Sequence, residues 1–216
     1  MYRPSMFDEL RPEVLHALIG DHPLGLLVRS GAGSGAAPQA DVIPWLIEPG
    51  PTPAGTLVGH VARANPLWQE AAGREVLVVF QGPQGYVSPG WYASKAEHGK
   101  VVPTWNYAMV QARGVLQAHE DPAAVLDIVT RLTERHESGR NLPWKVSDAP
   151  AGFVDTLLRA IVGVRIPLDS LVGKFKLSQN RPAADREGVC RGLQADGGDE
   201  RHALADWVAR AAPTNR

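Results

Sequence analysis

The sequence is poor in the residues that several common kinds of site require. It contains a single cysteine, Cys190, so it can form neither an intramolecular disulfide nor a cysteine-based zinc cluster. It holds no apolar run of about 18 residues, which excludes an apolar transmembrane helix. Its first residues lack the apolar segment of a signal peptide. We therefore expect a cytoplasmic protein with no membrane partner and no metal site.

Charge of one sign is also lacking. The 22 lysines and arginines nearly balance the 23 aspartates and glutamates, giving a net charge of -1. No global field therefore attracts nucleic acid, and a DNA contact would need a local basic patch. The sequence also contains no nucleophile elbow, no phosphate-binding P-loop, no zinc-protease motif and no dinucleotide fingerprint. We predict no catalytic residue from motifs.

Glycine and proline are plentiful, with 22 and 18 residues, which favours a turn-rich β protein. Strands are expected over residues 24–29, 41–47, 55–61, 75–81 and 160–167, and a further strand within residues 101–117. Gly82-Pro83 is expected to end the fourth, and a turn before Leu171 the last. Helices are expected over 11–19, from Pro66, from Asp121, and over 153–158 and 198–211, and the glycine-rich stretch 31–35 is expected to be a loop. Since strands and helices do not alternate regularly, a half-closed antiparallel barrel with peripheral helices is favoured.

One segment, residues 59–68, combines a strand end with a helix start. It places His60 and Arg63 beside Asn65, which can cap the helix. Backbone N–H groups at a helix start, together with an arginine, can bind a phosphate. Equally, Arg63 can be an ordinary surface ion-pair partner and His60 a satisfied barrel residue.

Two further segments are rich in aromatic side chains. The first, residues 82–95, includes Ser88, Trp91 and Lys95, and the second, residues 101–107, includes Thr104, Trp105 and Asn106. Aromatic walls with a few polar groups can hold a planar heterocycle. The same rings can instead fill a core or a dimer interface.

A fourth segment, residues 173–182, is basic and polar. If it is extended, Lys174 and Lys176 lie on one face, and Gln179 and Arg181 follow. Such lysines can bind a phosphate or a DNA backbone. The alternative is a solvated basic edge that discourages strand pairing.

Across these segments the chain resembles the PaiB-type negative transcriptional regulators. The resemblance runs from Met1 to about Leu193. It is carried by Pro23-Leu24-Gly25, Gly59-His60-Val61-Ala62-Arg63-Ala64-Asn65-Pro66, Phe80-Gln81-Gly82-Pro83, Val102-Pro103-Thr104-Trp105-Asn106-Tyr107 and Gly173-Lys174-Phe175-Lys176-Leu177-Ser178-Gln179-Asn180-Arg181-Pro182. It implies a mainly β, Greek-key-like, FMN-binding split β-barrel with flanking helices and a C-terminal helix. We expect residues 1–193 to form this domain and residues 194–216 to form a helical extension packed on it.

The resemblance also implies a homodimer with FMN at the subunit interface, and a set of flavin-binding positions. These are Asp41, Val42, Ile43, His60, Val61, Ala62, Arg63, Asn65, Ser88, Trp91, Lys95, Thr104, Trp105, Asn106, Lys174, Lys176 and Gln179. Arg63 falls where the wider superfamily holds the FMN phosphate. Two positions depart from the family pattern, because Val42 and Gln111 stand where members commonly carry histidines.

More than one function is compatible with these features. The resemblance implies a negative transcriptional regulator, for which Lys174, Lys176 and Arg181 are the first candidates for DNA phosphate contact. The alternative is a flavin-dependent oxidoreductase or flavin reductase that uses a nicotinamide reductant or a small-molecule substrate. A third hypothesis is haem binding with His60 as ligand.

Overall fold

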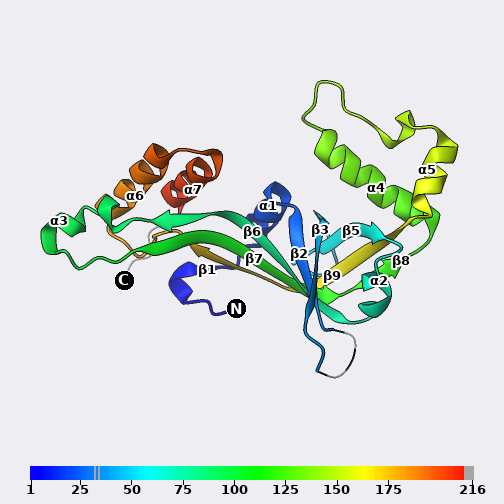
Figure 1. The fold of residues 1–216 in the computed structure, drawn as a ribbon, viewed down its shortest axis with the longest axis horizontal. Helices are drawn as coiled ribbons and strands as arrows, with labels where there is room; N and C mark the ends of the chain where they lie inside the picture. The colour runs from blue at the N-terminus through cyan, green and yellow to red at the C-terminus, as the bar shows by residue number, and fades with distance from the viewer. Residues whose placement is uncertain (32, 34, 212–216) are drawn as a thin grey trace. The chain divides into compact units, whose positions relative to one another are not determined.

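The computed structural model describes residues 1–31, 33 and 35–211 (Figure 1). Parts of the loop predicted at 31–35 and of the extension predicted at 194–216 therefore lie outside the described residues. The chain packs into two compact units. Unit 1 comprises Met1–Arg11, Gln81–Val110 and Val172–Arg216, and unit 2 comprises Pro12–Phe80 and Gln111–Leu171.

Unit 2 is built on antiparallel strands. β2 (Leu24–Arg29) pairs with β3 (Gln39–Pro44) and with the first part of β6 (Glu75–Val87). β5 (Thr56–Ala62) pairs with β4 (Leu46–Glu48) and with the first part of β9 (Ile161–Lys176), which also pairs with β8 (Gln117–His119). The last part of β7 (Thr104–Val115) belongs to this unit as well.

The helices of unit 2 are α1 (Pro12–Asp21), α2 (Leu67–Glu70), α4 (Pro122–Glu137), the 3-10 turn η3 (Val146–Asp148) and α5 (Ala151–Leu158). The predicted start of α4 is confirmed: Asp121 accepts a 2.9 Å hydrogen bond from the backbone N–H of Ala124, with Pro122 in the first turn. Helical spacing then places Ile128 and Leu132 against Val58 of β5. This contact buries one face of the strand pair β4–β5.

Unit 1 is built on the remaining parts of β6, β7 and β9, with β1 (Asp8–Glu9) paired to β9. Its helical segments are η1 (Ser5–Phe7), η2 (Pro89–Trp91), α3 (Ser94–His98), α6 (Ala183–Asp196) and α7 (Asp199–Arg210). Within this unit, α6 and α7 lie on one side of the strands and the N-terminal segment on the other (Figure 1). The edge-on contact between Phe175 and Trp207, with ring centroids 5.2 Å apart, joins β9 to α7.

The hydrogen-bonding order of the strands is β3-β2-β6-β7-β9-β5-β4, with β1 and β8 added on β9. The prediction of a mainly antiparallel β fold with flanking helices is confirmed. Two predicted strand ends are wrong. β6 continues through Gly82 and Pro83, both buried, where the alternation of burial changes phase as it does at a β-bulge that tolerates proline. β9 continues past Pro167, which is the last residue to pair with β5.

The helix α6 has no counterpart among the predicted elements. Two of its buried positions are Gly188 and Gly192, and a Cβ at Gly192 would lie 2.2 Å from the Trp91 ring. The indole of Trp91 therefore packs directly on the helix backbone. Glycines at buried positions remove the apolar periodicity from which a helix is predicted.

No helix in the described part of the chain is both long and apolar enough to cross a bilayer.

The predicted division of the chain into a domain of residues 1–193 and an extension of residues 194–216 stays a prediction.

Candidate functional site

Asn65 organises the predicted positions of unit 2. Its side-chain amide donates a 2.8 Å hydrogen bond to Oδ1 of Asp41 on β3, and its Oδ1 accepts a 2.9 Å bond from the N–H of Leu67. The same side chain thus holds β3 and starts α2, as predicted for a capping residue. Arg63 lies two residues before it, in the turn that follows β5.

The guanidinium of Arg63 is held by backbone oxygens and one carboxylate. It donates to the carbonyls of Arg159 at 2.9 Å and Ile161 at 3.3 Å, and it pairs with Glu120 at 2.6 Å. The side chains of Arg63 and Glu120 are 37% and 55% exposed. A pair this exposed contributes at most about 1 kcal/mol, so exchanging Glu120 for a phosphate would cost little.

Two histidines face each other across one glycine in unit 2. In the strand register, His60 of β5 and His119 of β8 both pair with Gly163 of β9. Nδ1 of His60 and Nε2 of His119 are buried and have no hydrogen-bond partner. Burial lowers the pKa of both imidazoles, and the neighbouring Arg165 lowers that of His119 further. Burial therefore favours the neutral form of both rings at pH 7.

The sequence pattern did not single out His119. It lies 59 positions after His60, and only the strand register brings both histidines to Gly163. Of the other predicted positions in unit 2, Ile43 and Val61 are buried, and Ala62 is exposed at the end of β5.

Val42 belongs to an apolar sheet face in unit 2. It pairs across the strands with Leu26, which in turn pairs with Val79, and Leu24 pairs with Pro44. Leu24 is 63% exposed, Leu26 39% and Val42 60%. Contiguous exposed apolar side chains on a sheet are typical of a protein–protein interface.

In unit 1, the predicted positions on β7 and β9 meet. Lys176 donates to the hydroxyl of Thr104, and the ammonium of Lys174 lies 5.5 Å and 5.6 Å from the ring centroids of Tyr2 and Tyr107. These cation–π contacts hold the Lys174 ammonium between two rings.

The turn after β9 is fixed by buried amides. Asn106 donates a 2.9 Å bond to the hydroxyl of Ser178, and Gln179 accepts a 2.7 Å bond from the N–H of Leu177 and donates to the carbonyl of Phe175. Asn106 and Gln179, both predicted positions, therefore support the backbone from which the basic side chains project.

The remaining predicted positions of unit 1 have different surroundings. Ser88 caps η2 by accepting from the N–H of Gly90, and Trp91 packs on α6. Lys95 is exposed on α3. Trp105 is 49% exposed and donates a 2.8 Å bond to Gln84, with its ring edge-on to Tyr86.

The donor sets of both units fit the groups of FMN. The phosphate needs cations and N–H donors, which either Arg63 in unit 2 or the lysines of β9 in unit 1 can supply. The buried, unpartnered atoms Nδ1 of His60 and Oδ1 of Asn106 leave hydrogen-bonding capacity for a polar ligand. When bound, FMN supplies a ring system that accepts and returns electrons.

The comparisons with known proteins agree with this chemistry. Residues 1–170 match the model of a family described as "Putative FMN-binding domain". The uncharacterized protein AN0679 of Emericella nidulans is 35% identical over 242 residues, covering 96% of each chain. The protease synthase and sporulation protein PAI 2 of Bacillus subtilis is 34% identical over 139 residues, covering 64% of each chain.

Among solved structures, the flavocytochrome Anf3 of Azotobacter vinelandii superposes with a TM-score of 0.57 at 12% identity, covering 81% of this chain and 72% of its own. At that identity the likeness shows the fold alone. It confirms the predicted split barrel. The family match confirms the predicted cofactor, FMN, and with its 170 residues it shows that the chain belongs to this FMN-binding domain family.

Proposed function

We propose that this FMN-binding protein acts as a homodimeric negative regulator of transcription. The observation that carries the proposal is the similarity to the protein from Bacillus subtilis whose name refers to protease synthesis and sporulation. Among the residues that the structure describes, no helix-turn-helix supports the proposal independently, so regulation is tested on the whole protein.

The apolar face around Val42 supports the dimer. Its residues come from three neighbouring hydrogen-bonded strands, and an exposed apolar sheet face suits an interface between two copies of one chain. We place the flavin at this dimer interface, with Arg63 and Asn65 as the phosphate side of the site.

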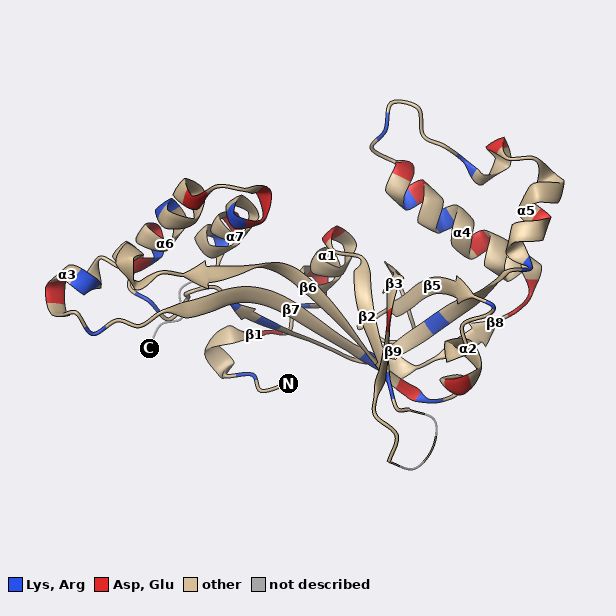
Figure 2. Ribbon diagram, in the orientation of Figure 1, with Lys and Arg blue, Asp and Glu red and all other residues tan. Residues whose placement is uncertain are grey.

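The α6–α7 hairpin is not the basic surface that a DNA-reading helix needs. The two helices meet at Gly197 and Gly198, both with positive φ. Three of their four arginines are matched by acids, because Arg191, Arg201 and Arg210 lie 3.8–4.0 Å from Glu187, Asp196 and Asp206. Figure 2 shows this mixture of signs along both helices.

Repression can be tested with DNA from upstream of the protein's own gene. We expect the FMN-loaded protein to lower expression of a reporter placed behind that DNA, and to shift it in a gel more strongly at low salt than at high salt. A reporter that responds equally with and without the protein would contradict regulation. Repression without a gel shift would retain the regulatory role and assign the DNA contact to a partner protein.

A second candidate, a flavin-dependent oxidoreductase, is favoured by His60. A neutral, half-buried imidazole with an unpartnered nitrogen can exchange a proton with a reduced flavin or a substrate. Stopped-flow mixing of the FMN-loaded protein with NADH or NADPH tests this role. Rapid bleaching of the flavin absorbance, slowed in His60→Gln, supports an enzyme, and an unchanged spectrum contradicts it.

The visible absorbance spectrum of the purified protein tests the third hypothesis, haem binding, which predicts a strong Soret band.

A further inference from the structure

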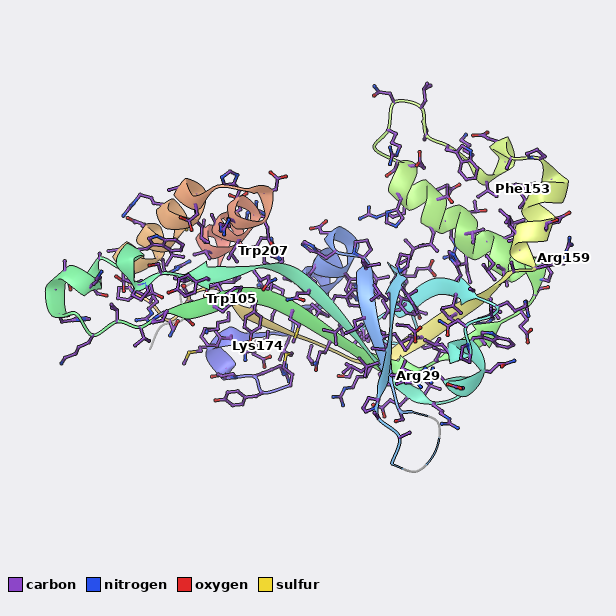
Figure 3. All side chains as sticks on the ribbon, viewed as in Figure 1. Arg29, Trp105, Phe153, Arg159, Lys174 and Trp207 are labelled. Carbon is purple, nitrogen blue, oxygen red and sulfur yellow. The ribbon has the colours of Figure 1, made fainter. Side chains whose placement is uncertain are left out.

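Three cations of unit 1 have no carboxylate partner. Among the described residues, Lys174, Lys176 and Arg181 form no ion pair. Asp8 of β1 lies opposite Lys174 in the strand register but does not bind it. The carboxylate of Asp8 is bound instead to Arg3. Figure 3 shows Lys174 on the side of the unit 1 strands that carries the N-terminal segment, away from Trp207. Lys174 and Lys176, two positions apart on β9, therefore lie on one face of the strand with no carboxylate bound to either.

The local field acts on Lys176 most directly. Burial lowers the pKa of its ammonium, and the charges of Lys174 and Arg181 lower it further. Like charges held together in a half-buried place are unfavourable in the free protein. A bound anion would remove that repulsion.

Two buried polar atoms near these cations have no partner. Tyr92 is only 3% exposed and its hydroxyl makes no hydrogen bond, while the Arg181 guanidinium lies 4.6 Å above its ring. Asn106 is fully buried, and its Oδ1 is likewise unpartnered. A buried hydroxyl without a partner loses about 1–3 kcal/mol relative to a satisfied one, so such an atom beside a cation indicates a missing ligand.

The turn that carries Arg181 is strained. Ser178 has φ of 62°, the left-handed region, and it is the one non-glycine residue with positive φ in the part of the chain that the structure describes. The buried side chain of Asn106 holds Ser178 in place, and Gln179 ties the turn to the end of β9. Strain kept by buried supports is typical of ligand-binding turns.

We propose that Lys174, Lys176, Arg181 and the Tyr92 hydroxyl bind a phosphate monoester group of a small nucleotide. Lys174 and Lys176 are among the positions at which the family resemblance implies flavin contact, whereas Arg181 and Tyr92 are not. A compact phosphate suits them better than duplex DNA, because Lys174, Lys176 and Arg181 are only half-exposed and Tyr92 is buried. The inference rests on the proposed flavin binding only where the phosphate is that of FMN, in which case these cations, and not Arg63, hold it. It does not depend on repression.

Paired ligands that differ by one phosphate test the site. Calorimetry of the full chain would compare FMN with riboflavin, and NADPH with NADH. In the unsubstituted protein we expect at least one phosphate-bearing ligand to bind more than tenfold more tightly than its counterpart. That ratio should fall about tenfold in Lys176→Met and in Arg181→Met, and stay unchanged in Lys100→Met, a matched change at an exposed lysine of the same unit.

The two ligand pairs distinguish the source of the phosphate. Loss of the FMN-to-riboflavin ratio assigns the site to the flavin, and loss of the NADPH-to-NADH ratio assigns it to a second nucleotide. Lys176→Arg, which keeps the charge, should retain most of the ratio, and thermal melts of each variant exclude unfolding as the cause. The proposal is overturned if neither affinity ratio exceeds tenfold in the unsubstituted protein. It is also overturned if both ratios survive in the Met variants, even where those variants lose DNA binding. Loss of repression in the Met variants with both ratios intact would overturn the phosphate site and leave the regulator standing, so the two failures are separate.

Discussion

The side-chain amide of Asn65 donates to the carboxylate of Asp41, 24 positions earlier in the chain, across a distance of 2.8 Å. This bond fixes the turn between β5 and α2, and Arg63 is part of that turn. The main chain at Arg63 is therefore held in place partly by β3, through the bond between Asn65 and Asp41. A flavin phosphate bound there would meet an arginine whose main chain is already ordered.

The first prediction concerns that arginine. Arg63→Ala should weaken FMN binding about ten- to hundredfold, because a charge-assisted contact to a phosphate contributes about 1.5–3 kcal/mol. Riboflavin, which lacks the phosphate, should bind equally to both proteins. Titration of flavin fluorescence measures both affinities, with Arg113→Ala, at an exposed arginine of the same unit, as control. An FMN affinity equal to that of the unsubstituted protein would remove Arg63 from the site.

The second prediction concerns the packing of Trp91. Gly192→Ala places a methyl group 2.2 Å from the indole ring, and Gly188→Ala places one 1.9 Å from the Trp91 carbonyl oxygen. Either change should lower the free energy of unfolding by about 1–3 kcal/mol, because helix and ring must separate. Chemical denaturation measures this loss. Gly152→Ala, where a Cβ meets no atom within 4 Å, is the control and should be neutral or slightly stabilising. Equal stability of all three variants would show that α6 can move away without cost.

The third prediction concerns pH. Burial lowers the pKa of His60 in the native state below its pKa in the unfolded chain. At a pH between these two pKa values, the unfolded chain binds a proton that the native state does not. The contribution of His60 to the free energy of unfolding is therefore fully present above pH about 6.5. It falls as the pH drops below that value, by at most about 1.4 kcal/mol per pH unit. Denaturation curves from pH 7.5 to pH 5 should show a shallower decline in His60→Gln than in His136→Gln, which changes an exposed histidine. Identical slopes would mean that His60 is protonated without cost in the native state.

The fourth prediction concerns the apolar sheet face. Val42→Asp places a charge among Leu26 and its neighbours, and desolvating that charge should weaken the dimer at least tenfold. Sedimentation velocity over a concentration series measures the dissociation constant. Val102→Asp changes a valine of similar exposure in unit 1, 64% against 60%, and should leave the dimer unchanged. A dimer that withstands Val42→Asp must use another surface.

The elements with strong local signals could be predicted from the sequence. α4 has a capping aspartate, a first-turn proline and apolar residues at helical spacing, and β2 was predicted with its observed bounds. Pro83 and Pro167 were misleading, because tertiary context tolerates a proline where pairing shifts or ends. α6 was missed because glycines occupy its contact with Trp91.

The site was predictable in part for the same reason. Residue type and order single out Arg63, Asn65, Lys174 and Lys176, because their chemistry is local. Nothing in the sequence shows that His119 and His60 share Gly163, that Glu120 meets Arg63, or that the Tyr92 hydroxyl is buried without a partner. These are products of strand register and burial, which depend on the whole fold.

The two units do not correspond to two stretches of chain. The polypeptide passes from one to the other after Arg11, Phe80, Val110 and Leu171, and the last three passages lie inside β6, β7 and β9. No stop codon or single protease cut can therefore release either unit intact. A truncation at residue 170, where the family match ends, would divide β9 and remove Lys174, Lys176 and Arg181 together. Expression of this protein for binding studies should keep the complete chain.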